Sequence, residues 1–236
     1  MYPDREKGSG RAIPVFLNDE NRFHAGVFLF GSAIGLYLAA NHFHFVPPQL
    51  LSFTTLDSWI PFIPQSVWVY VSEYLLFAWV YLSTKDYGHL SRYFFSFFTL
   101  QLVSVLIFWV YPTTYPRDLF PLPEGLDKMT HLLFESLRST DSPASCCPSL
   151  HVSATLLTAL LFRDAQKGEH PFKVRGVGLW AVLICVSTLT TKQHYLMDVF
   201  AGLFLAVVVF WVFHRILPTR LVFRKTENAP FTVDGI

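Results

Sequence analysis

The stretch that decides the fold runs from residue 195 to residue 217 and reads YLMDVFAGLFLAVVVFWVFHRIL. Its charged side chains are Asp198, near the start, and Arg215, near the end. A helix needs about 20 mostly apolar residues to cross the hydrocarbon core of a bilayer. This stretch is therefore predicted to be a membrane-spanning helix.

Five similar stretches precede it. The six predicted spans cover approximately residues 23–46, 65–83, 93–111, 148–162, 176–191 and 195–217. The second contains Glu73, and the fourth and fifth are short for a span. No linker long enough to separate two domains lies between them. The sequence thus predicts an all-α integral membrane protein with a single membrane domain, a six-transmembrane helical bundle (23–217) between two tails, 1–22 and 218–236.

The composition agrees with this prediction. Of the 236 residues, 52% are hydrophobic, 17% are aromatic and only 15% are charged, and the mean hydropathy is +0.38. An ordinary soluble domain is about 25% charged. So apolar a composition excludes a disordered chain and a nucleic-acid-binding protein. The composition does not by itself exclude a soluble enzyme. The distribution of the apolar residues along the chain decides between a soluble enzyme and a membrane protein. The charged N-terminus and the long first apolar run do not resemble a cleavable signal peptide.

The basic residues predict the orientation of the spans. When the loops of a six-span chain are assigned alternately to the two sides, 14 of the 18 Lys and Arg residues fall on one side. The other side receives Arg117, Lys128, Arg138 and Lys192. Cytoplasmic loops of membrane proteins carry the excess of positive charge. Both tails are therefore predicted to be cytoplasmic. The third-to-fourth and fifth-to-sixth loops face the periplasm of a bacterium, if the host membrane is an inner (plasma) membrane, or the lumen of an endomembrane.

The loop between the third and fourth predicted spans contains a further helical pattern. Leu126, Met129, Leu133 and Leu137 recur at helical spacing, with polar residues between them. Two placements remain open for this helix. It can lie in the membrane interface as an amphipathic helix, or it can pack on the bundle.

An imidazole and a carboxylate stand at the start of the sixth predicted span. His194 precedes Asp198 by four residues, so the two side chains share a helix face. An ionisable group inside a span is costly and indicates a functional site. A carboxylate that accepts the ring N–H fixes the tautomer of the imidazole and raises its basicity. The alternative is a polar pair that only bonds a neighbouring helix.

The fourth predicted span opens with Pro-Ser-Leu-His at residues 148–151. Proline suits the first turn of a helix because the N–H that it lacks would be unpaired there. The free N–H groups and the dipole at such a helix end favour an anion. Ser149 and His151 would then face a bound phosphate. The alternative is a capped helix start with an incidental histidine.

A third polar cluster, YPTTYPRD at residues 111–118, leaves the third predicted span. Its prolines keep the backbone extended. Arg117 in this cluster and Lys192 near His194 are two of the four basic residues on this side. A guanidinium binds two phosphate oxygens at once, and an ammonium acts as a point charge. A lone arginine in a loop is otherwise simply solvated.

The charge rule assigns all three clusters to the same side of the membrane without regard to their chemistry. Together they indicate a phosphoryl-transfer site. The sequence has no Walker-type glycine loop and no acidic cluster for Mg²⁺, so neither a metal nor a cofactor is expected. The candidate catalytic residues are His194, His151 and Asp198, and the candidate phosphate-binding residues are Arg117, Lys192 and Ser149.

These motifs resemble those of the type 2 phosphatidic acid phosphatase superfamily. That family carries Pro-Ser-x-His at one helix start and Ser-Arg-x5-His-x3-Asp at another. Residues 148–151 match the first motif in full, and Ser187, His194 and Asp198 match the spacing of the second. Thr188 stands where the second motif has its Arg.

The family also carries an earlier Lys-x6-Arg-Pro. Arg117 can stand for the Arg of that motif, but Asp118 follows it and no Lys precedes it by seven residues. The runs Tyr-Pro-Thr-x-x-Pro-Arg at 111–117 and Lys-Gln-His-Tyr at 192–195 are similar to the inositol phosphorylceramide synthase and sphingomyelin synthase-like branch. In that branch a cation nearer the His does the work of the missing Arg. The resemblance covers about residues 105–205.

The resemblance implies a two-step transfer on a phospholipid or other lipid phosphate in the membrane, without a nucleic-acid partner. His194, oriented by Asp198, attacks phosphorus and forms a phosphohistidine. His151 protonates the departing alkoxide and then activates the acceptor. Arg117, Lys192 and Ser149 neutralise the non-bridging oxygens.

Several alternatives stay open. The acceptor is water in a lipid phosphatase, and a lipid or inositol hydroxyl in a phosphotransferase. A phosphatase for polyprenyl or nucleotide pyrophosphates has the same motifs. Thr188 and the missing Lys also keep open a non-catalytic relative or a transporter. The sequence leaves the oligomeric state, the donor head group and the role of Glu73 undetermined.

Overall fold

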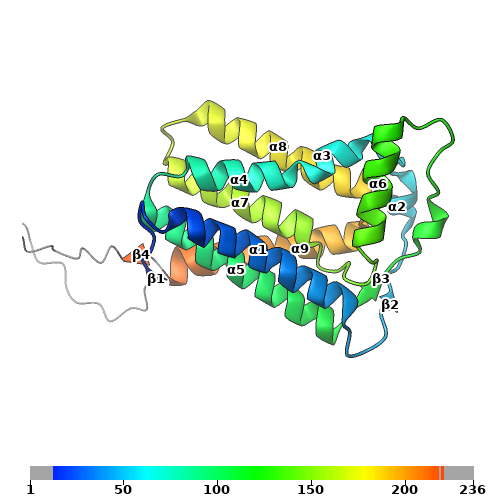
Figure 1. The fold of residues 1–236 in the computed structure, drawn as a ribbon, viewed down its shortest axis with the longest axis horizontal. Helices are drawn as coiled ribbons and strands as arrows, with labels where there is room; N and C mark the ends of the chain where they lie inside the picture. The colour runs from blue at the N-terminus through cyan, green and yellow to red at the C-terminus, as the bar shows by residue number, and fades with distance from the viewer. Residues whose placement is uncertain (1–12, 218, 221–236) are drawn as a thin grey trace, which may run out of the picture.

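The computed structural model describes residues 13–217 and 219–220, and most of this part of the chain is helical (Figure 1). The predicted cytoplasmic tails fall largely outside it, since 1–12, 218 and 221–236 are not among the described residues. The five longest helices in the described chain are α1 (Arg22–His42), α5 (Tyr87–Val110), α7 (Leu150–Gln166), α8 (Pro171–Thr190) and α9 (Leu196–Trp211). A π-helical turn, η3 (Val212–Ile216), continues α9.

Within the described residues, four segments are long and apolar enough to span a membrane, and they indicate an integral membrane protein. They are Arg22–His42, Tyr87–Val110, Pro171–Thr190 and Leu196–Ile216. These four correspond to the first, third, fifth and sixth predicted spans.

The other two predicted spans are shorter as helices. α7 has 17 residues. The 65–83 stretch is divided at Ser72 into α3 (Val67–Val71) and α4 (Glu73–Ser83), after the 3-10 turn η1 (Pro64–Ser66). The count of six spans and the orientation of the spans in the membrane therefore stay predictions.

The helix surfaces carry the pattern of a membrane protein. Large apolar side chains such as Phe28, Leu75, Leu179 and Phe204 are exposed on the outer faces of α1, α4, α8 and α9. A helix that is apolar all round is either buried in a protein core or placed in lipid. Within the described residues, no other segment covers these apolar faces. Contact with lipid would therefore bury them.

α7 lies at the centre of the bundle and contacts α4, α5, α8 and α9. Leu157 on α7 is fully buried. α9 approaches the start of α7 very closely at Gly202, where an added Cβ would lie 2.6 Å from the carbonyl oxygen of Ser149. Only glycine permits this approach, which brings the first turns of the two helices together.

The two ends of the bundle differ (Figure 1). At one end, β1 (Ile13–Pro14) pairs with β4 (Thr219–Arg220), so both ends of the described chain lie together. At the other end, short elements gather over the helices. They are β2 (Gln49–Leu50), which pairs with β3 (Thr113–Thr114), α2 (Thr55–Trp59), η2 (Arg117–Leu119) and α6 (Lys128–Thr140).

The helix predicted in the third-to-fourth loop is present as α6. Its contact with α3 includes a hydrogen bond of 2.9 Å from Trp68 Nε1 to Thr130 Oγ1. Phe134 is buried, whereas Met129 of the predicted apolar face is exposed. α6 thus covers the end of the bundle where the predicted catalytic residues lie.

Candidate active site

His194 and Asp198 form a hydrogen-bonded pair at the start of α9. His194 Nδ1 lies 2.7 Å from Asp198 Oδ2, as the spacing of four residues predicts. Asp198 is fully buried, and His194 is 8% exposed. No hydrogen bond to Nε2 of His194 is found within the described chain. With its N–H given to the carboxylate, the ring therefore presents a free Nε2 lone pair, which is what a nucleophile needs.

The backbone before α9 fixes the position of His194. The N–H of His194 donates to the carbonyl of Thr188 at 3.1 Å, and Lys192 adopts a left-handed conformation with φ of 54°. Asp57 of α2 accepts the N–H of Leu196 through Oδ1 at 2.8 Å. Asp57 thus caps the first turn of α9 from another helix, because Tyr195 at the N-cap position gives no side-chain bond.

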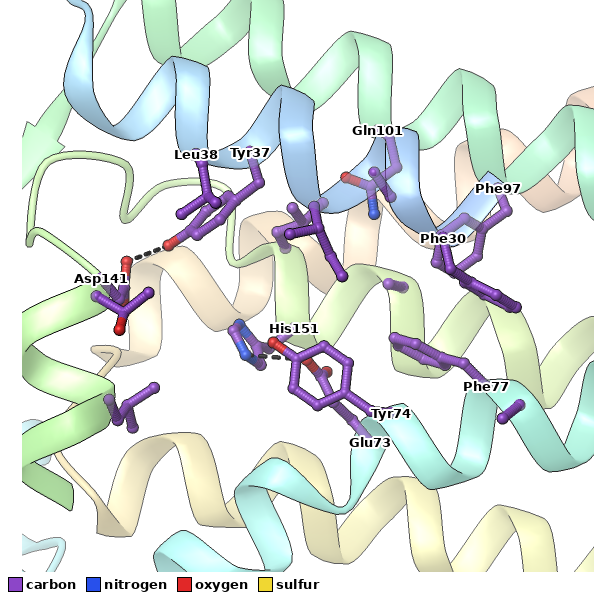
Figure 2. A pocket seen from close by; sticks show the side chains of 17 residues that line it. Phe30, Tyr37, Leu38, Glu73, Tyr74, Phe77, Phe97, Gln101, Asp141 and His151 are labelled. Atoms are coloured by element: carbon purple, nitrogen blue, oxygen red, sulfur yellow. Dashed lines mark hydrogen bonds and ion pairs between the residues drawn. The ribbon is translucent and has the colours of Figure 1, made fainter. Parts of the chain in front are cut away.

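His151 forms a second imidazole–carboxylate pair, with Glu73 (Figure 2). Its Nε2 lies 2.9 Å from Glu73 Oε1. Its Nδ1 lies 3.2 Å from the hydroxyl of Tyr70, and the two rings stack with centroids 4.3 Å apart. Thr155 donates to the other oxygen of Glu73 at 3.4 Å. Nδ1 of His151 therefore has a hydrogen-bond partner, whereas Nε2 is within ion-pair distance of Glu73 without the geometry of a hydrogen bond.

The two histidines lie next to each other. Their ring centroids are 6.0 Å apart. This separation is about two hydrogen-bond lengths, so one phosphate group can contact both rings.

Ser149 makes hydrogen bonds to the first turns of both α7 and α9. Its hydroxyl accepts the N–H of Val152 at 3.3 Å, and its own N–H donates to the carbonyl of Asp198 at 2.9 Å. The structure thus brings Ser149, His151, His194 and Asp198 to one place, through the close contact of α7 and α9.

Arg117 is engaged with protein groups. It pairs with Asp141, with Nη2 3.1 Å from Oδ2, and Nη1 donates to the backbone carbonyls of Asp141 and Arg138. Nε donates to the hydroxyl of Tyr115 at 3.3 Å, and that hydroxyl in turn lies 3.4 Å from Gln193 Oε1. Arg117 is therefore linked to the 191–195 loop through Tyr115. Four of its five N–H donors are used within the protein, and one is left for a ligand.

Lys192 is also engaged. Its Nζ donates to the carbonyl oxygens of Asp57, at 2.9 Å, and Ile60, at 2.6 Å. Burial lowers the pKa of Lys192, and the charge of Asp57 partly opposes this. One of its three N–H donors is left for a phosphate.

Sequence reasoning missed three residues of this arrangement. The sequence marks Glu73 as an outlier but does not give its partner, His151. Tyr70 lies three residues before Glu73. In the sequence alone, this spacing could have indicated that the two side chains point to the same side of the predicted helix. The spacing of Thr54 and Asp57 indicates a capping box, which the structure contains, but not the bond from Asp57 to Leu196.

A cavity of about 520 Å³ opens beside His151 (Figure 2). It lies between α1, α4, α5, α6 and α7, and most of its lining is apolar, including Phe30, Phe77 and Phe97. Glu73 and His151 form part of its wall. Across 13–217 and 219–220, no group of three or more His, Cys, Asp or Glu side chains is arranged to hold a metal ion.

Comparison with protein families gives one match. The sequence model of the PAP2 superfamily matches residues 35–212, which include both histidines and their two carboxylate partners. Comparison with curated proteins gives no match.

Proposed function

The chain belongs to the PAP2 superfamily, and on that premise we propose that it is a membrane-embedded, metal-independent lipid phosphatase or phosphotransferase. Membership supports a phosphatase-type activity and association with the membrane. The observation that carries the finer proposal is that His194, bonded to Asp198 through Nδ1, has no hydrogen bond to Nε2 within the described chain and lies next to His151, with 6.0 Å between the ring centroids.

In the first step, Nε2 of His194 attacks the phosphorus of a lipid phosphoester. The bond from phosphorus to the lipid oxygen breaks, and a phosphohistidine forms. Asp198 keeps the proton on Nδ1 and stabilises the positive charge of the ring. His151 gives a proton to the departing oxygen. Since Nε2 of His151 contacts Glu73, the proton leaves from Nδ1, directly or through the hydroxyl of Tyr70.

In the second step, His151 takes a proton from the acceptor. The acceptor oxygen attacks the phosphorus, the bond from phosphorus to Nε2 breaks, and His194 is restored. The acceptor is water in a phosphatase and a lipid or inositol hydroxyl in a transferase. The Lys-Gln-His-Tyr run at 192–195 favours the transferase branch. Its Lys192 would supply the positive charge of the family's Arg, because Thr188 stands at the position of that Arg.

The non-bridging oxygens need positive partners during both steps. We assign this role to the N–H groups at the start of α7, the hydroxyl of Ser149 and the remaining N–H donors of Lys192 and Arg117. We further propose that the bundle has six spans, with the site on the periplasmic or lumenal side. The pairing of β1 with β4 supports an even number of crossings, because it puts both ends of the described part of the chain at one end of the bundle.

The direct test measures phosphate release from diacylglycerol phosphate by the purified protein in detergent. His194→Ala is expected to lose turnover by at least about 10³-fold, because no other group can replace the nucleophile. The matched control is His131→Ala on the exposed face of α6, which should retain full activity. Transferase activity appears as inositol phosphate when inositol is added, or as a new lipid phosphate when a second lipid alcohol is added. Equal turnover by His194→Ala and the parent would contradict the proposal.

A further inference from the structure

A second cavity, of about 720 Å³, lies at the end of the bundle away from the candidate active site. Its wall comes from the end of α7, the start of α8, the end of α9 and η3. Figure 1 shows the α7–α8 connection at the opposite end of the bundle from α2 and α6. Arg163 in this wall lies 14 residues after Ser149, about 21 Å along α7. The cavity is therefore separate from the two histidines.

The wall of this cavity is strongly basic. Its cationic side chains come from three parts of the chain and are Arg163, Lys167, Arg175 and Arg215. Within the described residues, none of the four forms a salt bridge or a side-chain hydrogen bond. Arg175 lies over the ring of Phe172, 5.9 Å from its centroid. Four positive charges are therefore available to an anion.

Among the described residues, the wall contains one carboxylate, Asp164, and other groups already engage it. Its Oδ2 lies 2.6 Å from Nη1 of Arg92, and its Oδ1 lies 3.4 Å from Nδ1 of His214. Asp164 therefore cannot neutralise the four cations as well. Like charges in one cavity repel each other, and an anion that binds between them removes this repulsion.

The chemistry of the cations indicates the type of anion. Three of the four are arginines, and a planar guanidinium binds two phosphate oxygens at once. Four positive charges suit a ligand that carries more than one negative charge. A volume of about 720 Å³ lies within the usual range of ligand sites, about 300–1,000 Å³. The cavity therefore suits a group with two phosphates.

The wall also has an apolar part, which indicates where the anion comes from. Phe210 and Trp211 belong to it. Trp211 is 54% exposed and shares the outer face of α9 with Phe204 and Val207, which are 72% and 51% exposed. Tryptophan is enriched where a membrane protein passes from lipid to water. An apolar face of α9 thus leads into the basic cavity. Acyl chains would cover this face, whereas a soluble phosphate would leave it bare.

We propose that this cavity binds the head group of an anionic phospholipid that carries two phosphates, with the acyl chains along the outer face of α9. Basic pockets between membrane helices suit such head groups. The inference uses neither histidine of the candidate active site. It therefore stands or falls separately from the proposed function.

The test measures the binding of diphosphatidylglycerol, a phospholipid with two phosphates, to the purified full chain in neutral detergent by native mass spectrometry. Arg163→Gln and Arg175→Gln should each raise Kd about 3- to 10-fold, as expected for the loss of one basic contact with an anionic lipid. Lys173→Gln is the matched control, because Lys173 has the same charge at the start of α8 but does not line the cavity. It should change Kd less than about twofold. An equal loss in all three variants would overturn the proposal, because it would show only a general attraction to basic surface.

Crosslinking locates the bound lipid. Diphosphatidylglycerol with a diazirine in one acyl chain is irradiated with the protein, and the labelled peptides are mapped. Labels are expected within 204–211 in the parent and equally in His194→Ala, with at least about a fivefold loss when Arg163→Gln and Arg175→Gln are combined. Labels confined to 149–155 and 191–198 would place the lipid in the candidate active site and overturn the proposal.

Two further measurements separate a lipid site from its alternatives. The deacylated head group has the same phosphates without acyl chains, and it should bind at least about tenfold more weakly than the lipid. Equal affinity would assign the cavity to a soluble anion and overturn the lipid assignment. Without lipid, Arg163→Gln should unfold at the same temperature as the parent or higher, because it removes one of four like charges. A lower unfolding temperature together with weaker binding would indicate a structural role and contradict the inference.

Discussion

At the scale of single residues, the candidate site consists of two imidazole–carboxylate pairs whose imidazole centroids lie 6.0 Å apart. In the first pair, Asp198 orients His194. In the second, Glu73 holds His151 with the help of Tyr70. Glu73 is buried inside the bundle, and His151 is its ion-pair partner there.

This arrangement makes a prediction for Glu73→Gln. The amide keeps the shape of the side chain but removes the charge that favours a protonated His151. Turnover should fall about 10- to 100-fold, because a positioned proton donor contributes roughly 10²–10⁴-fold. The measurement is kcat for phosphate release. Glu135→Gln on the exposed face of α6 is the control, and full activity in Glu73→Gln would contradict a role for the pair.

The two pairs also show what the sequence can predict. His194 and Asp198 are four residues apart, so helical geometry alone places them together. Glu73 and His151 are far apart in the chain, and only the packing of α4 against α7 joins them. The motifs predict that Arg117 and Lys192 bind the phosphate, and this stays a prediction. Their bonds to Asp141 and to the carbonyl of Asp57 depend on loop geometry that no spacing encodes.

At the scale of elements, the predicted catalytic residues lie at the starts of α7 and α9. Two features fix the position of these helix starts. Gly202 allows α9 to approach Ser149, and Asp57 of α2 caps α9. Apolar length predicted the long helices well. It did not predict the division at Ser72 or the short α2, since neither changes the run of hydrophobic residues enough to be seen.

Gly202→Ala tests the close approach. The added Cβ would lie 2.6 Å from the carbonyl oxygen of Ser149, so the helices must separate. The variant should lose about 1–3 kcal/mol of stability and most of its activity, because His151 and His194 move apart. Gly31→Ala on α1, where nothing lies within 4 Å of the added Cβ, should be as stable as the parent or more so, by up to about 1 kcal/mol. Thermal unfolding and turnover check both variants; similar behaviour of the two would contradict this account.

Asp57→Ala tests the cap from α2. It removes the acceptor of the Leu196 N–H, two residues after His194, so both stability, by about 0.5–2 kcal/mol, and turnover should fall. Asp86→Ala removes an ordinary cap at the start of α5, where Asp86 accepts the N–H of His89 at 2.7 Å. It should cost a similar amount of stability and leave turnover unchanged. Loss of turnover in both variants would show that the effect is on stability alone.

At the scale of the whole molecule, the predicted orientation has a direct consequence. Lys128, at the start of α6, and Lys167, after α7, belong to loops that the charge pattern assigns to opposite sides. In a variant without the native cysteines and present in a plasma membrane, Lys128→Cys should react with an impermeant maleimide added outside intact cells. Lys167→Cys should react there only after permeabilisation. Reaction of both before permeabilisation would contradict the six-span arrangement.

The central claim is that His194 carries the phosphoryl group. The most direct measurement incubates the protein with a ³²P-labelled lipid phosphate, quenches it in alkali, which preserves phosphohistidine, and maps the label by mass spectrometry. The account predicts phosphate on His194 in the parent and none in His194→Ala. Turnover without any label on His194, or a label on another residue, would contradict it.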